Sequence, residues 1–404
     1  MQIFTDKKIK SLISPPPQAP FLGRGKKGRR KRRNAKLYRH LYNKKMDKLT
    51  DIENKVMREE RLSFEDGLRL FKSNDLLTIG RLANIVRERK NGDMAYFISN
   101  RHLNYSNICV NNCRFCAFRK SKGEEGAYSM RIKDIEQFAE SIDSTDFSEL
   151  HVVGSLEPDF TFQYYIDLLS TLSHLFPGVH IQAFTAVEIA HIAKMGNMPV
   201  KDALEKLIDA GLGSLPGGGA EIFNEATRAK ICPDKISGNE WLDIMKTAHS
   251  LGLKSNATML YGHIETLKDR VDHLIRLRET QDESGGFLAF IPLAFHPANT
   301  EYSSMSRTSG IDDLKMIAIS RLMLDNFPHI KAFWIMIGPK LSQISLSFGG
   351  DDIDGTVIEE KITHAAGADT ERGLTRERLI GMIREAGRVP VERGTLYDHI
   401  KVWV

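Results

Sequence analysis

Cysteine is scarce in this chain, at four of 404 residues, which excludes a small secreted scaffold held together by disulfides. Long apolar runs are also missing, since nothing approaches the roughly 18 residues that a membrane-spanning helix needs. The N-terminus lacks the compact apolar region and small-residue cleavage site of a secretory signal. With 41% hydrophobic residues the chain can bury a full core. We therefore expect a cytoplasmic protein that does not enter a membrane.

Acidic residues are nearly absent from the first 45 positions, which hold 15 Lys and Arg but one acid, Asp6. The other 359 residues carry 42 basic and 51 acidic side chains, a net charge of −9. This basic arm (1–45) has the composition of a disordered extension. One alternative is an electrostatic tail for nucleic acid. Another, which we favour, is that translation starts at Met46 and the arm is not made.

Helical patterns fill 46–94. Ser63 stands three residues before Asp66, the spacing of a capping box, and an apolar face follows. The region 95–350 then alternates β-like runs with helix-period stretches, which predicts parallel strands joined by right-handed crossovers. We expect a TIM-like (β/α) barrel, complete or partial, followed by a helical cap over 351–404. The β-like runs are 95–109, 149–155, 180–187, 212–218, 253–262, 287–295 and 331–338.

Three of the four cysteines lie within eight residues, directly after the first β-like run. Cys109, Cys113 and Cys116 have the spacing C-x3-C-x2-C, and Phe115 precedes the last of them. A closed zinc site would need a fourth ligand. The candidates are poor, because His102 lies inside the preceding strand and Cys232 is over 100 residues away. We expect Cys232 only to pack at a helix end.

A [4Fe-4S] cluster normally takes four cysteines, so three would leave one iron open to a reactant. The motif resembles the signature of the radical S-adenosylmethionine superfamily. That resemblance implies a cluster whose open iron chelates S-adenosylmethionine. Reductive cleavage then gives methionine and a 5′-deoxyadenosyl radical, which the protein shields from water. In TIM-like barrels such chemistry takes place at the C-terminal ends of the strands.

Residues at other predicted strand ends are further candidates. The superfamily's contact to the methionine amino group falls at 152–159, where Glu157 is the available acid although the expected glycine-rich turn is altered. Glu188 could accept from the ribose or the amino group, or it could simply begin a helix. Gly217, Gly218 and Gly219, expected just before a helix near Ala220, could hold an anion or only form a tight turn.

Two polar residues follow the sixth β-like run, His296 and Asn299, and we expect them to contact the substrate.

A resemblance to one family within the superfamily covers roughly 48–396, where the chain is similar to the aminodeoxyfutalosine synthases of menaquinone biosynthesis. The motifs that carry it are NRHLNYSNICVNNCRFCAF, AFTAVEI, SLPGGGAEIF, KICPDKIS, SNATMLYGHIET, HLIRLRETQDESGGF, FIPLAFHPANT, LMLDNFPHIKAFWIMIGPKL and DDIDGTVIEEKI.

This family resemblance implies a specific reaction. The adenosyl radical adds to the enol-ether double bond of 3-[(1-carboxyvinyl)oxy]benzoate, and rearrangement with loss of the carboxylate gives 6-amino-6-deoxyfutalosine. A low-potential donor such as a flavodoxin or ferredoxin would reduce the cluster. The runner-up is the dehypoxanthine futalosine cyclase of the same pathway, and the deazaflavin-forming synthases come third. An RNA-binding protein with a structural metal cluster would explain the basic arm but not the motifs.

Overall fold

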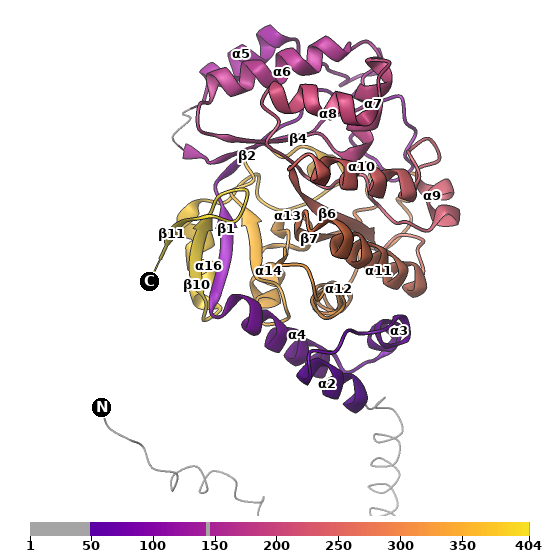
Figure 1. Cartoon of the computed structure of the whole chain (residues 1–404), viewed down its shortest axis with the longest axis vertical. Coiled ribbons are helices and arrows are strands. Elements are labelled where there is room, and N and C mark those ends of the chain that lie inside the picture. The colour runs from indigo at the N-terminus through magenta and orange to yellow at the C-terminus, as the bar shows by residue number, and fades with distance from the viewer. Residues whose placement is uncertain (1–48, 143–145, 404) are drawn as a thin grey trace, which may run out of the picture. The chain divides into compact units, whose positions relative to one another are not determined.

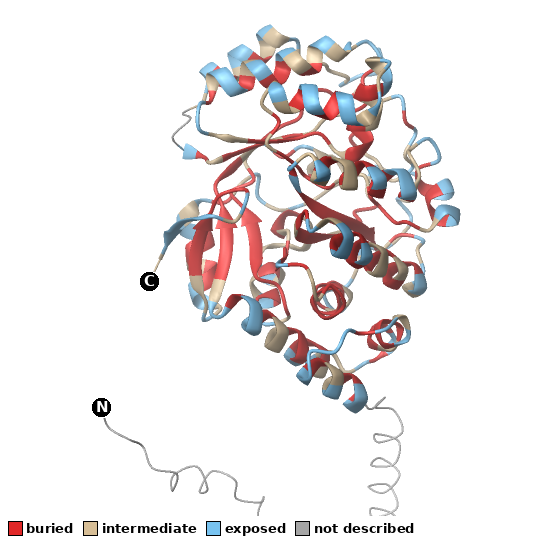
Figure 2. Ribbon diagram, viewed as in Figure 1, coloured by how far each residue is buried: buried red, intermediate tan, exposed pale blue. Residues whose placement is uncertain are grey.

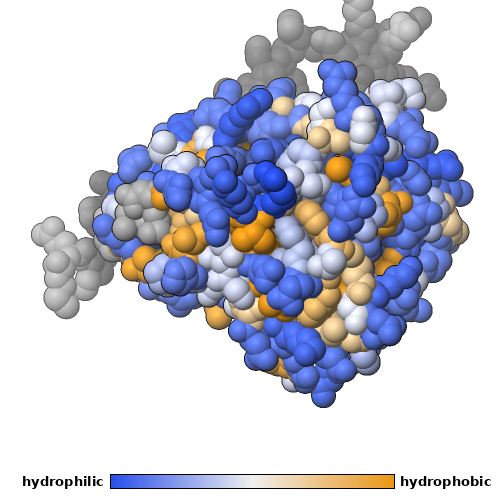
Figure 3. Space-filling view, turned by 90° about the horizontal axis from the view of Figure 1, so that it is seen from above, coloured by the Kyte–Doolittle hydropathy of each residue, from blue (hydrophilic) through white to orange (hydrophobic). Residues whose placement is uncertain are grey.

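The computed structural model describes residues 49–142 and 146–403. The basic arm and Met46, with the predictions made for them, lie outside these residues. Within the described residues no helix combines the length and apolarity required to cross a bilayer. The face in Figure 3 is largely hydrophilic, with apolar patches set between polar side chains.

A seven-stranded parallel sheet forms the centre of the fold, with its strands in chain order (Figure 1). Sequential order in a parallel sheet requires a crossover after each strand, as the alternating sequence pattern predicts. The strands are β2 (Asn100–Leu103), β3 (Glu149–Val152), β4 (His180–Ala183), β5 (Ser214–Leu215), β6 (Lys254–Tyr261), β7 (Phe287–Ala294) and β8 (His329–Ile330).

Helices connect these strands and cover the outside of the sheet. Figure 2 shows buried strands, while the helices bury one face and expose the other. Capping boxes begin several of them, for example Ser237 with Glu240 and Thr266 with Asp269. The connecting helices are α5 (Ile132–Glu140), α6 (Phe162–Leu175), α7 (Ala186–Met195), α8 (Val200–Asp209), α9 (Glu225–Ile231), α10 (Gly238–Ser250), α11 (Leu267–Ser284) and α12 (Gly310–Met323).

The N-terminal helices pack against the last two of these crossovers. They are α2 (Thr50–Met57), α3 (Phe64–Lys72) and α4 (Leu76–Asn91), with α3 against α11 and α4 against α12. The predicted capping box is confirmed: Ser63 Oγ accepts from the Asp66 backbone N–H, and the Asp66 carboxylate accepts from the Ser63 N–H at 2.9 Å.

A second sheet, in the order β11-β10-β1-β9, stands beside the first. The expected run 95–109 therefore divides into strands of two sheets, β1 (Met94–Ile98) and β2. The section 351–404 differs from the helical cap expected, because it contains strands as well as helices. Its elements are β9 (Asp352–Gly355), α15 (Ile362–Ala365), α16 (Arg376–Glu385), β10 (Val389–Arg393) and β11 (His399–Val402).

The predicted strand at 331–338 is wrong. The last strand of the large sheet, β8, ends at Ile330. The apolar run after it forms the short helix α13 (Trp334–Ile337), which is followed by α14 (Pro339–Ser345). Periodicity cannot distinguish a short buried strand from a short buried helix. Tertiary contacts decide here, because the Trp334 indole N–H donates to the Gly355 carbonyl at 2.8 Å and draws this run onto the second sheet.

Residues 352–358, which we name the closing segment, lie between the first and last strands of the large sheet. Bridges join Asp352 to Lys331, after β8, and Ile358 to Arg101, in β2. The His102 N–H donates to the Ile358 carbonyl at 2.9 Å. The large sheet is thus a curled, partial TIM-like barrel that the C-terminal section completes.

Candidate active site

A cavity of about 320 Å³ occupies the inside of the curled sheet. Side chains point to alternate faces of a strand, so every second residue reaches the interior. Asn100 and His102 of β2, with Asn104 directly after it, line the cavity in this way, as do Glu149 and His151 of β3, with Val153 directly after it. The volume is within the range of small-molecule sites.

The predicted cysteine loop forms one end of this cavity. Cys109, Cys113 and Cys116 all line it, and the loop follows β2 as expected. Backbone bonds fix the loop: the Val110 N–H donates to Leu156 at 3.1 Å and the Arg114 N–H to Ile231 at 2.9 Å. The three thiols are therefore held on the wall of an enclosed space by contacts to two other crossovers.

This donor set suits a cluster better than a single ion. Among the described residues, no group of three or more His, Cys, Asp or Glu side chains could hold one metal ion. In a [4Fe-4S] cluster each thiolate binds a different iron, so the sulfurs stand further apart. Three thiols spread along one cavity wall fit that larger group.

Charge near the cysteines also favours thiolates once iron is bound. Burial raises the pKa of the Cys113 thiol to about 12, although the positive charge of Lys235 acts to lower it. Lys235 forms a buried ion pair with Glu221, and its ammonium lies 5.1 Å from the centre of the Phe115 ring. Metal binding must displace the thiol protons, and Lys235 partly balances the negative charge that results. Phe115 lines the cavity with the cysteines.

Glu157 does not line the main cavity. Its carboxylate, buried at 1% exposure, accepts hydrogen bonds from the hydroxyls of Ser106 (3.0 Å) and Ser129. These bonds give it a structural part in the loop after β3. Its assignment to the methionine amino group stays a prediction.

Glu188 reaches the cavity wall and also forms the capping box of α7 with Thr185. Its carboxylate accepts from the Tyr105 hydroxyl at 2.6 Å, the Gly154 N–H at 3.0 Å and the Thr185 N–H at 2.7 Å. The helix-start interpretation accounts for the bond with Thr185, while Tyr105 and Gly154 tie the carboxylate to two other parts of the barrel. A contact to S-adenosylmethionine would come in addition to these bonds.

The expected start of the helix near Ala220 is wrong, because α9 begins only at Glu225. The Arg228 guanidinium donates to the carbonyls of Ala220 (2.5 Å) and Ile222 (3.1 Å), and Glu221 between them has a φ of 47°, so this stretch is not helical. Gly218 and Gly219 line the cavity. Gly217 instead packs on β6, where an added Cβ would lie 2.2 Å from the Asn256 carbonyl oxygen.

The two candidates after β7 separate in the structure. His296 lines the main cavity, and a ring N–H donates to the Met336 carbonyl at 2.8 Å, which leaves Nδ1 without a partner among the described residues. Asn299 lines a second hollow beside Cys113 and Cys116, and its amide donates to the Ala365 carbonyl at 2.9 Å. Cys232 is buried at the end of α9, as expected.

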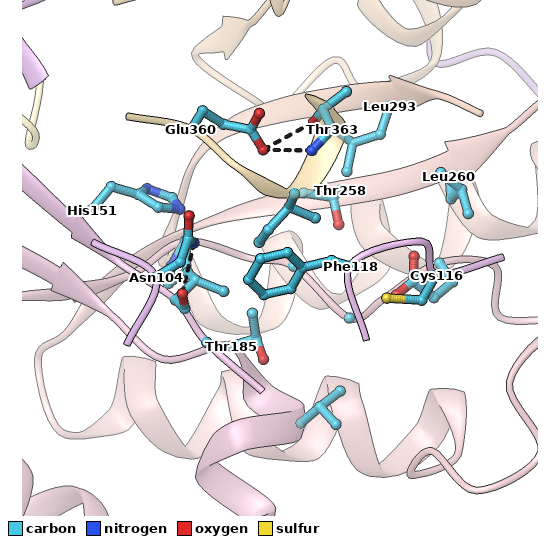
Figure 4. Close-up of a pocket in the computed structure, with 18 of the residues that line it drawn as sticks. Asn104, Cys116, Phe118, His151, Thr185, Thr258, Leu260, Leu293, Glu360 and Thr363 are labelled. Atoms are coloured by element: carbon cyan, nitrogen blue, oxygen red, sulfur yellow. Dashed lines mark hydrogen bonds between the residues drawn. The ribbon is translucent and has the colours of Figure 1, made fainter. Parts of the chain in front are cut away.

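The end of the cavity away from the cysteines was not anticipated. It is polar, and Figure 4 shows His151 and Cys116 on opposite sides of the view with the Phe118 ring between them. His102 stacks on His151 with ring centres 4.5 Å apart. Lys331 and Asp354 complete this polar end, and their charged atoms lie 3.9 Å apart.

Comparison with known proteins agrees with this architecture. Residues 103–277 match the radical SAM superfamily, and 284–403 match the CofH/MqnC C-terminal region. The fold resembles the FeFe-hydrogenase maturase HydG from Carboxydothermus hydrogenoformans, with a TM-score of 0.69 at 17% identity over 91% of this chain and 84% of that one. Methylornithine synthase gives 0.68 at 16% identity, over 84% and 97%.

Curated relatives are closer in sequence. An aminodeoxyfutalosine synthase of Thermus thermophilus is 48% identical over 88% of this chain and 97% of its own length. That of Streptomyces coelicolor is 44% identical over 87% and 94%. A cyclic dehypoxanthine futalosine synthase of Halalkalibacterium halodurans is 36% identical over 87% and 95%. The chain belongs to the aminodeoxyfutalosine synthase family of radical S-adenosylmethionine enzymes.

Proposed function

We propose that this protein is an aminodeoxyfutalosine synthase acting in menaquinone biosynthesis. The observation that carries the proposal is the 48% identity to a synthase of that name over nearly its whole length. The substrates are S-adenosylmethionine and 3-[(1-carboxyvinyl)oxy]benzoate, and the products are 6-amino-6-deoxyfutalosine, methionine and the released carboxylate as bicarbonate or CO2. A new carbon–carbon bond joins the adenosyl 5′ carbon to the former vinyl carbon.

Cys109, Cys113 and Cys116 would hold the [4Fe-4S] cluster. When bound, the cluster supplies the electron that cleaves S-adenosylmethionine and so generates the adenosyl radical. The chain contributes position and shielding, because apolar side chains line much of the cavity. They include Phe118, Val153, Leu260, Leu293 and Phe295.

Polar groups near this wall are suited to orient S-adenosylmethionine. Gly218 and Gly219 present backbone to the cavity, and Glu188 stands at its edge. The unpartnered Nδ1 of His296 is an acceptor, because the other ring nitrogen donates to Met336. We assign these four residues to the binding of S-adenosylmethionine or the second substrate.

An external one-electron donor of low potential, such as a flavodoxin or ferredoxin, would bring the cluster to its reduced state; the substrates and products given above balance without a further electron. Asn112, Arg114 and Arg119 line the second hollow, which Cys113 and Cys116 also line. We infer that the donor docks there, because the hollow reaches two of the three proposed cluster ligands. A reducing cytoplasm is the compartment that keeps such thiols free.

Anaerobic reconstitution tests the proposal. The protein is loaded with iron and sulfide, then given S-adenosylmethionine, a reductant and 3-[(1-carboxyvinyl)oxy]benzoate, and products are identified by mass spectrometry. Aminodeoxyfutalosine is expected. Formation of 5′-deoxyadenosine alone, together with turnover of dehypoxanthine futalosine, would instead assign the cyclase activity of the relative that is 36% identical.

A further inference from the structure

The polar end of the cavity contains charged and polar groups that the protein itself leaves without hydrogen bonds. Lys331 is 5% exposed and His102 is 8% exposed, and both line the cavity. Among the described residues, neither the Lys331 ammonium nor the His102 ring has a hydrogen-bond partner; the Asp354 carboxylate, 3.9 Å from the ammonium, forms only an ion pair. Because both groups face the cavity, their hydrogen bonds must come from whatever fills it. Such groups indicate a ligand.

Among the described residues, the carboxylates at this end form no hydrogen bond with Lys331. Glu149 accepts from the Asn100 amide at 3.3 Å; burial opposes its charged form, but the charge of Lys331 helps to hold the pKa of Glu149 below its usual range. Burial raises the pKa of Asp354, which weakens the negative charge an incoming anion would meet. Burial also lowers the pKa of His102 far below its usual range, so its ring is neutral and offers one N–H donor. Three ammonium protons and one ring N–H are therefore available to an anion.

The middle of the cavity has a different character. Phe118 lies between the two ends in Figure 4, and Ile291 and Leu293 of β7 also line the cavity. The cavity thus runs from the cysteines, past an apolar middle, to a polar end that holds Lys331. A ligand that matches this order has a reactive group, an aromatic body and a distant carboxylate.

The aromatic substrate has that order of groups. Its enol-ether double bond must lie near the adenosyl carbon, at the cysteine end, and the vinyl carboxylate is attached to the same double bond. The ring carboxylate is on the other side of the benzene ring. We propose that Lys331, assisted by His102, binds the ring carboxylate and so orients the substrate. This rests on the proposed function for the identity of the substrate.

Binding of an unreactive aryl carboxylate provides a test without turnover. The ligands are 3-methoxybenzoate and its neutral amide, measured by calorimetry on cluster-loaded protein with S-adenosylmethionine under anaerobic conditions. The wild type is expected to bind the carboxylate about 10- to 100-fold more tightly than the amide, the range for a charged hydrogen bond. Lys331→Met should abolish this preference. The matched control is Lys340→Met, which removes an exposed lysine and should keep it.

Kinetics give a second readout. Lys331→Met should raise KM for 3-[(1-carboxyvinyl)oxy]benzoate about 10- to 100-fold. It should leave KM for 2-phenoxyacrylate, which lacks the ring carboxylate, as in the wild type. Lys331→Gln carries the same expectation with a polar side chain, in case the methionine variant is unstable. An equal KM for the natural substrate, or an equal rise for both, would overturn the assignment.

The two proposals fail differently. If the wild type converts the enol ether but Lys331→Met keeps the preference for the carboxylate ligand, the role of Lys331 is refuted and the function stands. If the wild type prefers the carboxylate through Lys331 but does not convert the enol ether, the anion site stands and the synthase assignment is refuted.

Discussion

Lys235 and Glu221 form a buried ion pair on the cavity wall that also carries Cys113. Both side chains are largely withdrawn from solvent, at 14% and 8% exposure, so their charges are weakly screened. The cysteine loop thus has one fixed cation and one fixed anion beside it.

Removing either charge should shift the reduction potential of the loaded cluster. Lys235→Met takes away a cation and should lower the potential, while Glu221→Gln should raise it. A shift on the order of 1 kcal/mol corresponds to about 40 mV for one electron. Redox titration followed by electron paramagnetic resonance measures it. The double variant, which removes both charges, should return close to the wild-type value, and shifts of the same sign in both single variants would contradict the electrostatic explanation.

Each of the three loop cysteines should be required for the cluster. Replacing Cys109, Cys113 or Cys116 by Ala should abolish the absorbance near ~400 nm that reconstitution gives to such centres. Cys232→Ala is the control, because this buried thiol packs at the end of α9 and should be dispensable for the cluster. Iron and sulfide content per chain provides the measurement. A full cluster in the Cys113 variant would refute the ligand assignment.

His364 should make the stability of the C-terminal section depend on pH. Its hydrogen bond to the Glu360 carboxylate raises its pKa from 6.5 to about 9. Because the folded pKa is the higher one, the stabilisation is complete below pH 6.5 and is lost as the pH rises through 9.

The ring is partly solvated, so the effect is on the order of 1 kcal/mol. Chemical denaturation of the wild type and His364→Gln at a series of pH values measures it. The difference between the two should shrink as the pH rises from about 6.5 to above 9. A difference that stays constant over this range would rule out His364 as the source.

Gly217 should tolerate no side chain. Its φ of 86° disfavours L-residues, and a Cβ would lie 2.2 Å from the Asn256 carbonyl oxygen. We expect Gly217→Ala to cost more than about 3 kcal/mol, since strain and overlap add. Gly252→Ala is the matched control: φ is 89° and nothing lies within 4 Å of the added atom. Thermal unfolding should show a loss of only about 1 kcal/mol there.

Local patterns explain why much of the architecture could be predicted. Strand–helix alternation gave the parallel sheet, the spacing of Ser63 and Asp66 gave a helix start, and the cysteine spacing gave the loop. The incorrect predictions concern segments whose conformation is determined by contacts with residues distant in the sequence. Nothing near 95–109 shows that β1 pairs with β9 and β10 while β2 pairs with β3. The contacts of Arg228 and Trp334 are likewise tertiary.

The sequence contains a pattern from which the polar end of the cavity could have been predicted. Asn100, His102 and Asn104 are polar at every second position of β2 and the residue that follows it, and all three are buried. An ordinary half-buried strand exposes its polar face to solvent. Polar alternation in a strand of a parallel barrel, which is covered by helices outside, instead points to a ligand inside. No such pattern marks Lys331, because it follows β8, a strand of only two residues in which an alternation cannot be seen.

The closing segment also determines when the barrel can be completed. Thr356 bonds to Asn100 across 256 positions of sequence, so this wall of the cavity cannot form until the ribosome has made almost the whole chain. Contacts of such long range form slowly, because a large loop must first be closed. Until then the nascent half-barrel is open along one side, and its thiols and apolar lining face the surroundings. The protein's exposure to oxidation and aggregation is therefore greatest during synthesis.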